Sequence, residues 1–142
     1  VGVSTAWGSF AKASNPTLRD VHEFILVFSK GSPKLEPNGR ESGIKNDEFV
    51  EWTKSVWRFG TASPKQVGHP APFPEELPRR LMLLYTNEGD LVLDPFMGSG
   101  TTAVAAVKEG RHFIGYDVVE EYCATARERV DSVYANEFTS SP

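Results

Sequence analysis

A glycine-bearing turn between two acidic residues is the part of this 142-residue chain best suited to chemistry. Gly98-Ser99-Gly100 lets the backbone approach a ligand closely and then enter a helix, whose first N–H groups have no partner within the helix. Asp94 precedes the turn, and Asp117 follows it at the end of the next expected strand. An acidic side chain at that second position accepts hydrogen bonds from ribose hydroxyls in units of this kind. The pattern therefore predicts a ligand that contains adenosine.

Three classes of ligand compete for this turn. A nucleoside triphosphate needs a lysine after the second glycine, where this chain has Thr101. A dinucleotide is a better competitor because Gly98, Gly100 and Ala103 have its spacing, but the carboxylate of Asp94 at the strand end repels a pyrophosphate. The same carboxylate suits the ammonium group of a methionine moiety, so S-adenosylmethionine fits best. A tight turn that binds no ligand is the remaining alternative.

Short apolar segments alternate with helix-forming segments around the turn. The elements expected there are a buried strand over Leu91–Leu93, a second strand over His112–Tyr116 and helices over Thr101–Lys108 and Glu120–Val130, with a frayed tail over Asn136–Pro142. Gly110 is a good C-terminal cap for the first of these helices. Ile114 and Tyr116 are expected in the core. Strand, helix and strand in this order predict a βαβ unit with parallel strands and a right-handed crossover.

The first half of the chain predicts fewer regular elements. Val21–Phe28 is continuous in apolar residues from Phe24 onward and indicates a strand buried on both faces. Gly31–Arg40 contains two prolines and two glycines and predicts a loop. Helices are then expected from Asn46 or Asp47 onward and over Glu75–Tyr85.

The composition limits the class of protein. Hydrophobic residues make up 39% and charged residues 24%, which are ordinary values for a globular domain, and no apolar run is long enough to span a membrane. The net charge of −4 argues against a wholly basic nucleic-acid coat. The single Cys123 excludes an internal disulfide and a cysteine-built zinc site and fits a reducing compartment, and no metal site is predicted. No secretion leader is evident, and the start at Val1 suggests a trimmed or partial sequence.

Four segments resemble the motifs of the amino-group DNA methyltransferases, which methylate N4 of cytosine or N6 of adenine. Residues 94–102, Asp-Pro-Phe-Met-Gly-Ser-Gly-Thr-Thr, resemble motif I, and residues 69–81, which begin His-Pro-Ala-Pro-Phe-Pro, resemble motif X. Ile114–Asp117 resembles motif II, and Arg19–Lys30 resembles the segment around motif VIII. This order is that of the permuted beta group, and the resemblance covers nearly the whole chain.

The resemblance implies a partial Rossmann-like fold of the S-adenosylmethionine-dependent methyltransferases, an α/β fold with a mostly parallel sheet and helices on both faces. Residues 1–30 would form the motif VIII strand and target-base loop, 31–67 a short target-recognition segment, and 68–142 the cofactor-binding region of a single incomplete domain. Asp94 would contact the amino group of S-adenosyl-L-methionine, and Asp117 its ribose. The other cofactor residues would be Phe73, Phe96, Met97, Gly98, Ser99, Gly100 and Thr101, with His69 either at the approach to the pocket or only in a turn.

The catalytic motif of this family is missing from the chain. It consists of Asp, Asn or Ser followed by Pro-Pro and an aromatic residue, and no Pro-Pro occurs here. In the beta group this motif precedes segment VIII, so we expect it before Val1 and assign no catalytic residue. The chain is then the C-terminal portion of a methyltransferase and is inactive alone. Two rivals stay open: a non-catalytic half that needs a partner chain, or a decayed remnant of one, and an NAD-dependent oxidoreductase.

The resemblance also implies double-stranded DNA as the substrate, with a base flipped out of the helix for methylation. Such an enzyme would work in a prokaryotic cytoplasm, in a restriction–modification or epigenetic system, without membrane contact, and a homodimer of the full enzyme is compatible with it. The candidate DNA contacts, each equally compatible with a solvated surface charge, are Lys12, Arg19 and Lys30 on phosphates and Arg40, Lys54 and Arg58 on base edges or phosphates. Trp52 and Trp57 are expected to anchor a small core. The target base is open, with a slight lean towards cytosine N4.

Overall fold

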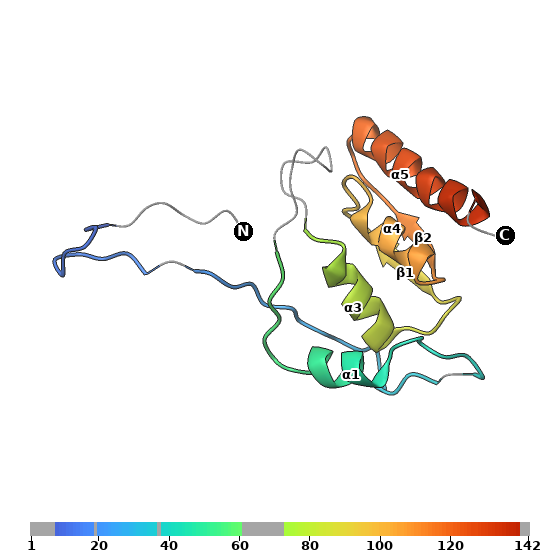
Figure 1. The fold of residues 1–142 in the computed structure, drawn as a ribbon, viewed down its shortest axis with the longest axis horizontal. Helices are drawn as coiled ribbons and strands as arrows, with labels where there is room; N and C mark the ends of the chain where they lie inside the picture. Colours follow the sequence, from blue (N-terminus) through green and yellow to red (C-terminus); the bar gives the residue numbers. More distant parts are fainter. Residues whose placement is uncertain (1–7, 19, 37, 61–72, 140–142) are drawn as a thin grey trace. The chain divides into compact units, whose positions relative to one another are not determined.

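The computed structural model describes residues 8–139 except positions 19, 37 and 61–72 (Figure 1). The chain divides into two compact units, Val1–Pro33 and Lys34–Pro142. The first unit contains a small turn in which Gly8 and Pro16 form an antiparallel bridge. The Oγ of Ser9 closes this turn by donating to the carbonyl of Lys12 at 2.7 Å and accepting from the N–H of Asn15 at 2.8 Å. No helix among the described residues is long and apolar enough to cross a membrane.

The strand predicted over Val21–Phe28 does not form. This segment has no regular secondary structure, and the side chains of Phe24, Leu26 and Phe28 are 82%, 73% and 86% exposed. A strand buried on both faces needs hydrogen-bonded neighbours and two covering layers, and the described residues of its unit supply neither. The sequence prediction is therefore wrong for this segment.

The second unit holds a βαβ unit with helices before and after it. Its elements are α1 (Asn46–Trp52), α3 (Glu76–Tyr85), β1 (Leu91–Asp94), α4 (Thr101–Lys108), β2 (His112–Gly115) and α5 (Glu120–Thr139) (Figure 1). The strands are parallel, with Leu91 paired to His112 and Asp94 paired to Gly115. The predicted strand–helix–strand unit with parallel strands is therefore confirmed.

Helix α4 is the centre of the core. Its apolar residues from Ala103 to Val107 are all at most 8% exposed. The small alanine side chains let neighbouring elements approach: Met82 of α3 packs with Ala105 and Ala106, while Val130 of α5 packs with Ala103. Figure 1 shows α4 next to the two strands, with α3 and α5 as its other neighbours. The core therefore forms where the helix following the glycine turn meets the sheet.

Only one face of the described sheet is covered. Val92 and Phe113 pack against the α3–α4 core, whereas Leu91 and Leu93 are each 60% exposed. Alternate side chains of a strand point to opposite faces, so the exposed residues mark the second face. The expectation of a buried strand over Leu91–Leu93 is wrong for the described residues, and so is the core position expected for Ile114 and Tyr116, which are 41% and 62% exposed.

The helix boundaries differ from the predicted ones mainly at the C-terminus. Helix α4 has the predicted bounds, and Gly110 follows its end with a φ of 71°. Helix α5 continues to Thr139 instead of stopping at Val130, so the tail predicted from Asn136 is helical up to that point. Val133 packs against the core one turn beyond Val130, and this contact stabilises the extra length.

We predict that Gly100→Ala destabilises the protein by about 2–4 kcal/mol. Gly100 has a φ of 81°, which costs an alanine about 1–2 kcal/mol, and an added Cβ would lie 2.6 Å from the Cβ of Ala126. Gly39→Ala is the matched control, because Gly39 has a φ of 76° but no atom within 4 Å of an added Cβ. Urea unfolding of the intact protein measures both. Equal losses would show that the contact with α5 adds nothing.

Candidate functional site

Two carboxylates hold the turn between β1 and α4. Asp94 Oδ1 accepts a hydrogen bond from the N–H of Phe96 at 3.0 Å. Asp117 Oδ2 accepts from the N–H of Gly98 at 2.9 Å, and its Oδ1 accepts from the N–H of Val119 at 2.9 Å. Asp117 thus joins the glycine turn to the residues that follow β2. The structure brings the two acidic residues predicted from the sequence to the same edge of the sheet, where the parallel strands end.

The glycines of the turn and of β2 are required by backbone conformation, by close packing or by both. Gly98 and Gly100 have φ values of 52° and 81°, in the left-handed region that favours glycine. At Gly115 an added Cβ would lie 2.1 Å from the Sδ of Met97. Met97 itself packs against the core cluster of α4 and α5. The structure therefore gives Met97 a packing role, and the cofactor contact predicted for it stays a prediction.

The N-terminus of α4 lacks a side-chain cap. Gly100 is the N-cap residue, and the first turn of the helix contains no acidic residue. The N–H groups of Thr101, Thr102 and Ala103 consequently have no partner from a capping side chain, and the helix dipole places partial positive charge there. Such an end is suited to an anionic group of a ligand.

Ser99 and Thr101 are buried and already hydrogen-bonded to α5. They are 4% and 6% exposed. Arg129 Nη1 donates to the carbonyl of Ser99 at 2.6 Å and lies 3.3 Å from Ser99 Oγ and 3.4 Å from Thr101 Oγ1. Arg129 was not among the site residues predicted from the sequence. Its partner Ser99 lies thirty residues earlier, so no local sequence pattern marked it.

The two aromatic residues predicted to contact the cofactor are both accessible. Phe96, within the turn, is 87% exposed, and Phe73, just before α3, is 39% exposed. Exposed aromatic side chains of this size are suited to contact with a planar ring. His69, also predicted at the site, lies outside the described residues. Among the described residues no group of three or more His, Cys, Asp or Glu side chains is arranged to hold a metal ion.

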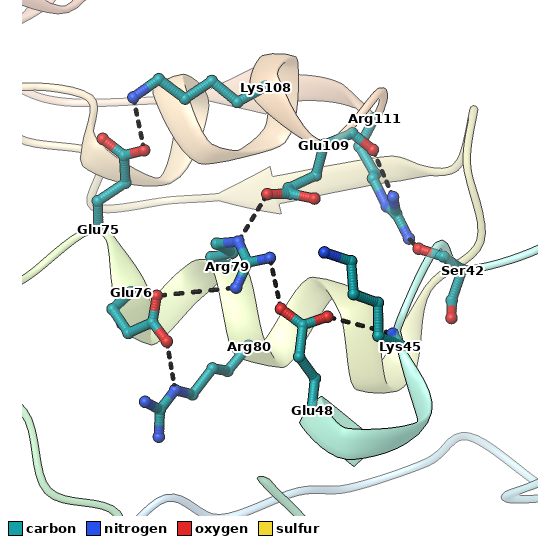
Figure 2. Close-up of polar contacts among 10 residues, drawn as sticks. All are labelled: Ser42, Lys45, Glu48, Glu75, Glu76, Arg79, Arg80, Lys108, Glu109 and Arg111. Carbon is teal, nitrogen blue, oxygen red and sulfur yellow. Dashed lines mark hydrogen bonds and ion pairs between the residues drawn. The ribbon is translucent and has the colours of Figure 1, made fainter. Parts of the chain in front are cut away.

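Helix α1, in the predicted recognition segment, is fixed to α3 through Arg79. The guanidinium donates to Glu48 Oε1 at 2.9 Å and to Glu109 Oε1 at 2.8 Å, and it lies 4.9 Å from the centroid of the Trp52 ring. Figure 2 shows this side chain surrounded by Glu48, Glu76 and Glu109. Burial would raise the pKa of Glu48, but hydrogen bonds from Arg79 and from the backbone of Lys45 outweigh it and lower that pKa.

Aromatic residues complete the attachment of this segment. Trp52 is 6% exposed, and the guanidinium of Arg80 lies 5.3 Å from its ring centroid. The same guanidinium lies 5.5 Å from the ring of Trp57 and 5.2 Å from that of Phe59. Trp57 Nε1 donates to the carbonyl of Trp52 at 2.8 Å. The prediction that Trp52 anchors a small core is confirmed, and Trp57 is attached to it.

Arg111 connects the loop before α1 to the βαβ unit. It is 4% exposed, and its Nη2 donates to the carbonyl of Ser42 at 2.7 Å (Figure 2). The same Nη2 donates to the carbonyl of Thr86 at 2.9 Å. Burial lowers the pKa of this guanidinium, although an arginine stays charged at neutral pH. The chain on both sides of α1 is thus held against the cofactor-binding region predicted from the sequence.

Five of the six predicted DNA contacts lie among the described residues, two in the first unit and three in the second. Lys12 and Lys30 are exposed in the first unit, and Arg19 lies outside the described residues. Lys54 and Arg58 are exposed just after α1, where Lys54 pairs with Glu51. Arg40 forms an ion pair with Asp90 at 2.6 Å and donates to the carbonyl of Glu88, so it braces the turn before β1. The hydrogen bond from the N–H of Asn87, despite burial, lowers the pKa of Asp90, and Arg40 adds to this effect.

A family model described as DNA methylase matches residues 4–128. The type II methyltransferase M.MjaI of Methanocaldococcus jannaschii is 35% identical over 130 residues, which cover 82% of this chain and 43% of that protein. M2.DpnII of Streptococcus pneumoniae, also a type II methyltransferase, is 52% identical over 113 residues, covering 78% of this chain and 42% of the relative. The chain thus spans less than half the length of these two proteins.

A solved structure matches at the level of the fold as well. TTHA0409 of Thermus thermophilus, crystallised in complex with S-adenosyl-L-methionine, is 35% identical to this chain with a TM-score of 0.54. The match covers 63% of this chain and 34% of that one. It supports a partial Rossmann-like α/β fold for this chain.

We predict that Arg79→Gln lowers the free energy of unfolding by about 1–3 kcal/mol at pH 7, because it leaves Glu48 and Glu109 without their partly buried partner. Folding lowers the pKa of Glu48 from its usual value of 4.5. The stabilisation that ionised Glu48 provides is therefore fully present above pH 4.5 and is lost as the pH falls through the folded-state pKa. The difference between wild type and variant should shrink over that acidic range in urea unfolding.

Lys34→Gln is the control for this experiment. Lys34 pairs with Glu36 at 3.2 Å, but both side chains are largely exposed, and such pairs contribute little to stability. A loss at Lys34→Gln as large as that at Arg79→Gln would contradict the role given to burial. A difference that persists unchanged into acid would contradict the role given to Glu48.

Proposed function

Because the chain belongs to the DNA methylase family, we propose that it forms the cofactor-binding and target-recognition portion of an S-adenosylmethionine-dependent DNA methyltransferase. One observation carries the cofactor assignment. The glycine turn places Asp94, Asp117 and an uncapped helix N-terminus at one edge of a parallel sheet, which is where ligands bind in α/β folds. The complex of TTHA0409 with S-adenosyl-L-methionine supports the same ligand here.

Each part of the proposed cofactor has a group of matching charge in the turn. The uncapped N–H groups of α4 suit its carboxylate, and Asp94 suits its ammonium group. The bonds that Asp117 accepts from Gly98 and Val119 occupy one position on each carboxylate oxygen and leave capacity for two ribose hydroxyls. Phe96 and Phe73 are accessible for contact with the adenine ring. When bound, this cofactor supplies an electrophilic methyl group.

The charge of Asp94 argues against the rival nicotinamide cofactor. A pyrophosphate carries negative charge and would approach a carboxylate at the end of β1. The cofactor proposed here instead brings a positive ammonium group to that end. We therefore favour the methyltransferase over an NAD-dependent oxidoreductase.

We propose that the catalytic Pro-Pro motif comes from further polypeptide, in the same protein or in a separate chain. Two observations support this: the chain spans less than half the length of M.MjaI and M2.DpnII, and one face of the described sheet exposes apolar residues such as Leu91 and Leu93. Parallel sheets are normally covered on both faces. The order of the motifs fits the permuted beta group.

The proposed substrate is double-stranded DNA in a prokaryotic cytoplasm, with N4 of cytosine or N6 of adenine as the acceptor. The attachment of α1 to α3 supports a recognition segment that is held in a defined position relative to the cofactor turn. Lys54 and Arg58, exposed next to that anchored helix, are the DNA contacts we favour in the second unit. Lys12, Arg19 and Lys30 remain proposed phosphate contacts, and a homodimer of the full enzyme remains a prediction.

We predict that S-adenosylhomocysteine raises the Tm of the intact protein and that NADH does not, because only the first brings an amino acid group to Asp94 and α4. Asp117→Asn should weaken S-adenosylhomocysteine binding about tenfold, since it removes the charge that strengthens the ribose hydrogen bonds. Asp131→Asn, a change at an exposed position of α5, is the matched control. Calorimetric titration measures both variants, and unchanged affinity at Asp117→Asn would remove this residue from the site.

A further inference from the structure

Arg129 fixes the peptide plane at the entrance to α4. Its Nη1 donates to the carbonyl of Ser99 at 2.6 Å, while the N–H of Gly100, on the other end of the same peptide group, donates to the carbonyl of Met97 at 3.0 Å. Both polar groups of this peptide are therefore held. The next residues supply the uncapped N–H groups of the helix. Their direction consequently depends on the contact that Arg129 makes.

The positive charge of Arg129 is poorly compensated. Within the part of the chain that the structure describes, its guanidinium forms no ion pair within 4 Å. Burial lowers its pKa, while the more distant charge of Glu75 raises it, and Glu75 is itself paired with Lys108 at 2.7 Å. An arginine stays protonated at neutral pH even so. A net positive charge thus lies among the residues on either side of the N-cap residue Gly100.

Arg129 also restricts what the neighbouring hydroxyls can do. A guanidinium has donors but no acceptor, so Ser99 Oγ and Thr101 Oγ1 act as acceptors towards it at 3.3 and 3.4 Å. Because Ser99 and Thr101 are only 4% and 6% exposed, their side chains are better suited to supporting the turn than to contacting a large ligand directly. The charge of Arg129 and the partial charge at the N-terminus of α4 are both positive, so both favour an anionic group of a ligand.

We propose that Arg129 is a positioning residue that makes this turn selective for a carboxylate-bearing ligand: it orients the peptide before Gly100 and adds positive charge at the N-terminus of α4. The inference rests on the proposed cofactor and assigns to Arg129 the discrimination between ligands with and without the amino acid carboxylate. It acts through the turn and the local field, and needs no contact with the reacting atoms.

Calorimetric titration of the intact protein with two ligands tests this. S-Adenosylmethionine has the carboxylate, and decarboxylated S-adenosylmethionine keeps the ammonium group but lacks it. Arg129→Gln should weaken binding of the first about tenfold and of the second less than about twofold. Arg127→Gln is the matched control, because Arg127 is exposed on the same helix. It should change neither affinity.

Arg129→Lys separates charge from general support and serves if Arg129→Gln does not fold. It keeps the charge but not the planar donor group, so S-adenosylmethionine should remain the preferred ligand by nearly the wild-type ratio. In Arg129→Gln, equal weakening of both ligands, or weakening of neither, would overturn the inference while leaving the proposed function intact. In Arg129→Lys, loss of the preference for S-adenosylmethionine would overturn it in the same way. Failure of the wild-type protein to bind S-adenosylmethionine would overturn both.

Discussion

The close approach of α5 to the N-terminus of α4 is the constraint on which the site depends. At Gly100 there is no room for a Cβ atom, because Ala126 of α5 would lie 2.6 Å away. The same glycine has a left-handed backbone and carries no capping side chain, so the first N–H groups of α4 are left for a ligand. Because α5 lies this close, Arg129 reaches Ser99. This packing contact therefore positions the turn, keeps the N-terminus of α4 uncapped and brings the positive charge of Arg129 to it.

A second set of contacts joins the recognition segment to this centre. Arg79 and Arg80 of α3 hold α1 through Glu48 and Trp52, and Arg111 holds the loop before it through Ser42. The three arginines are partly or wholly buried, so each is expensive to leave without its partners. We infer that the segment proposed to meet DNA moves together with the helices around the cofactor turn, which would keep target and cofactor in a defined relation.

Local patterns in the sequence predicted the centre of the fold better than its margins. Helix α4 and its parallel strands follow from an alanine-rich segment, a glycine turn and Gly110, all of which act within a few residues. The strand expected over Val21–Phe28 depends on neighbours that the described part of its unit does not supply, so its apolar composition was insufficient. Arg129 could not be recognised from local pattern alone, because its partner Ser99 is thirty residues away. Contacts between distant segments were the part that sequence reasoning could not provide.

The central claim is that the turn between β1 and α4 binds S-adenosylmethionine through its uncapped helix end and its two acidic residues. A crystal structure of the intact protein with S-adenosylhomocysteine tests this most directly. We expect the amino acid carboxylate at the N–H groups of Thr101 to Ala103, the ammonium group at Asp94 and the ribose hydroxyls at Asp117. A ligand bound elsewhere, or one placed at this turn with its carboxylate directed away from α4, would contradict it.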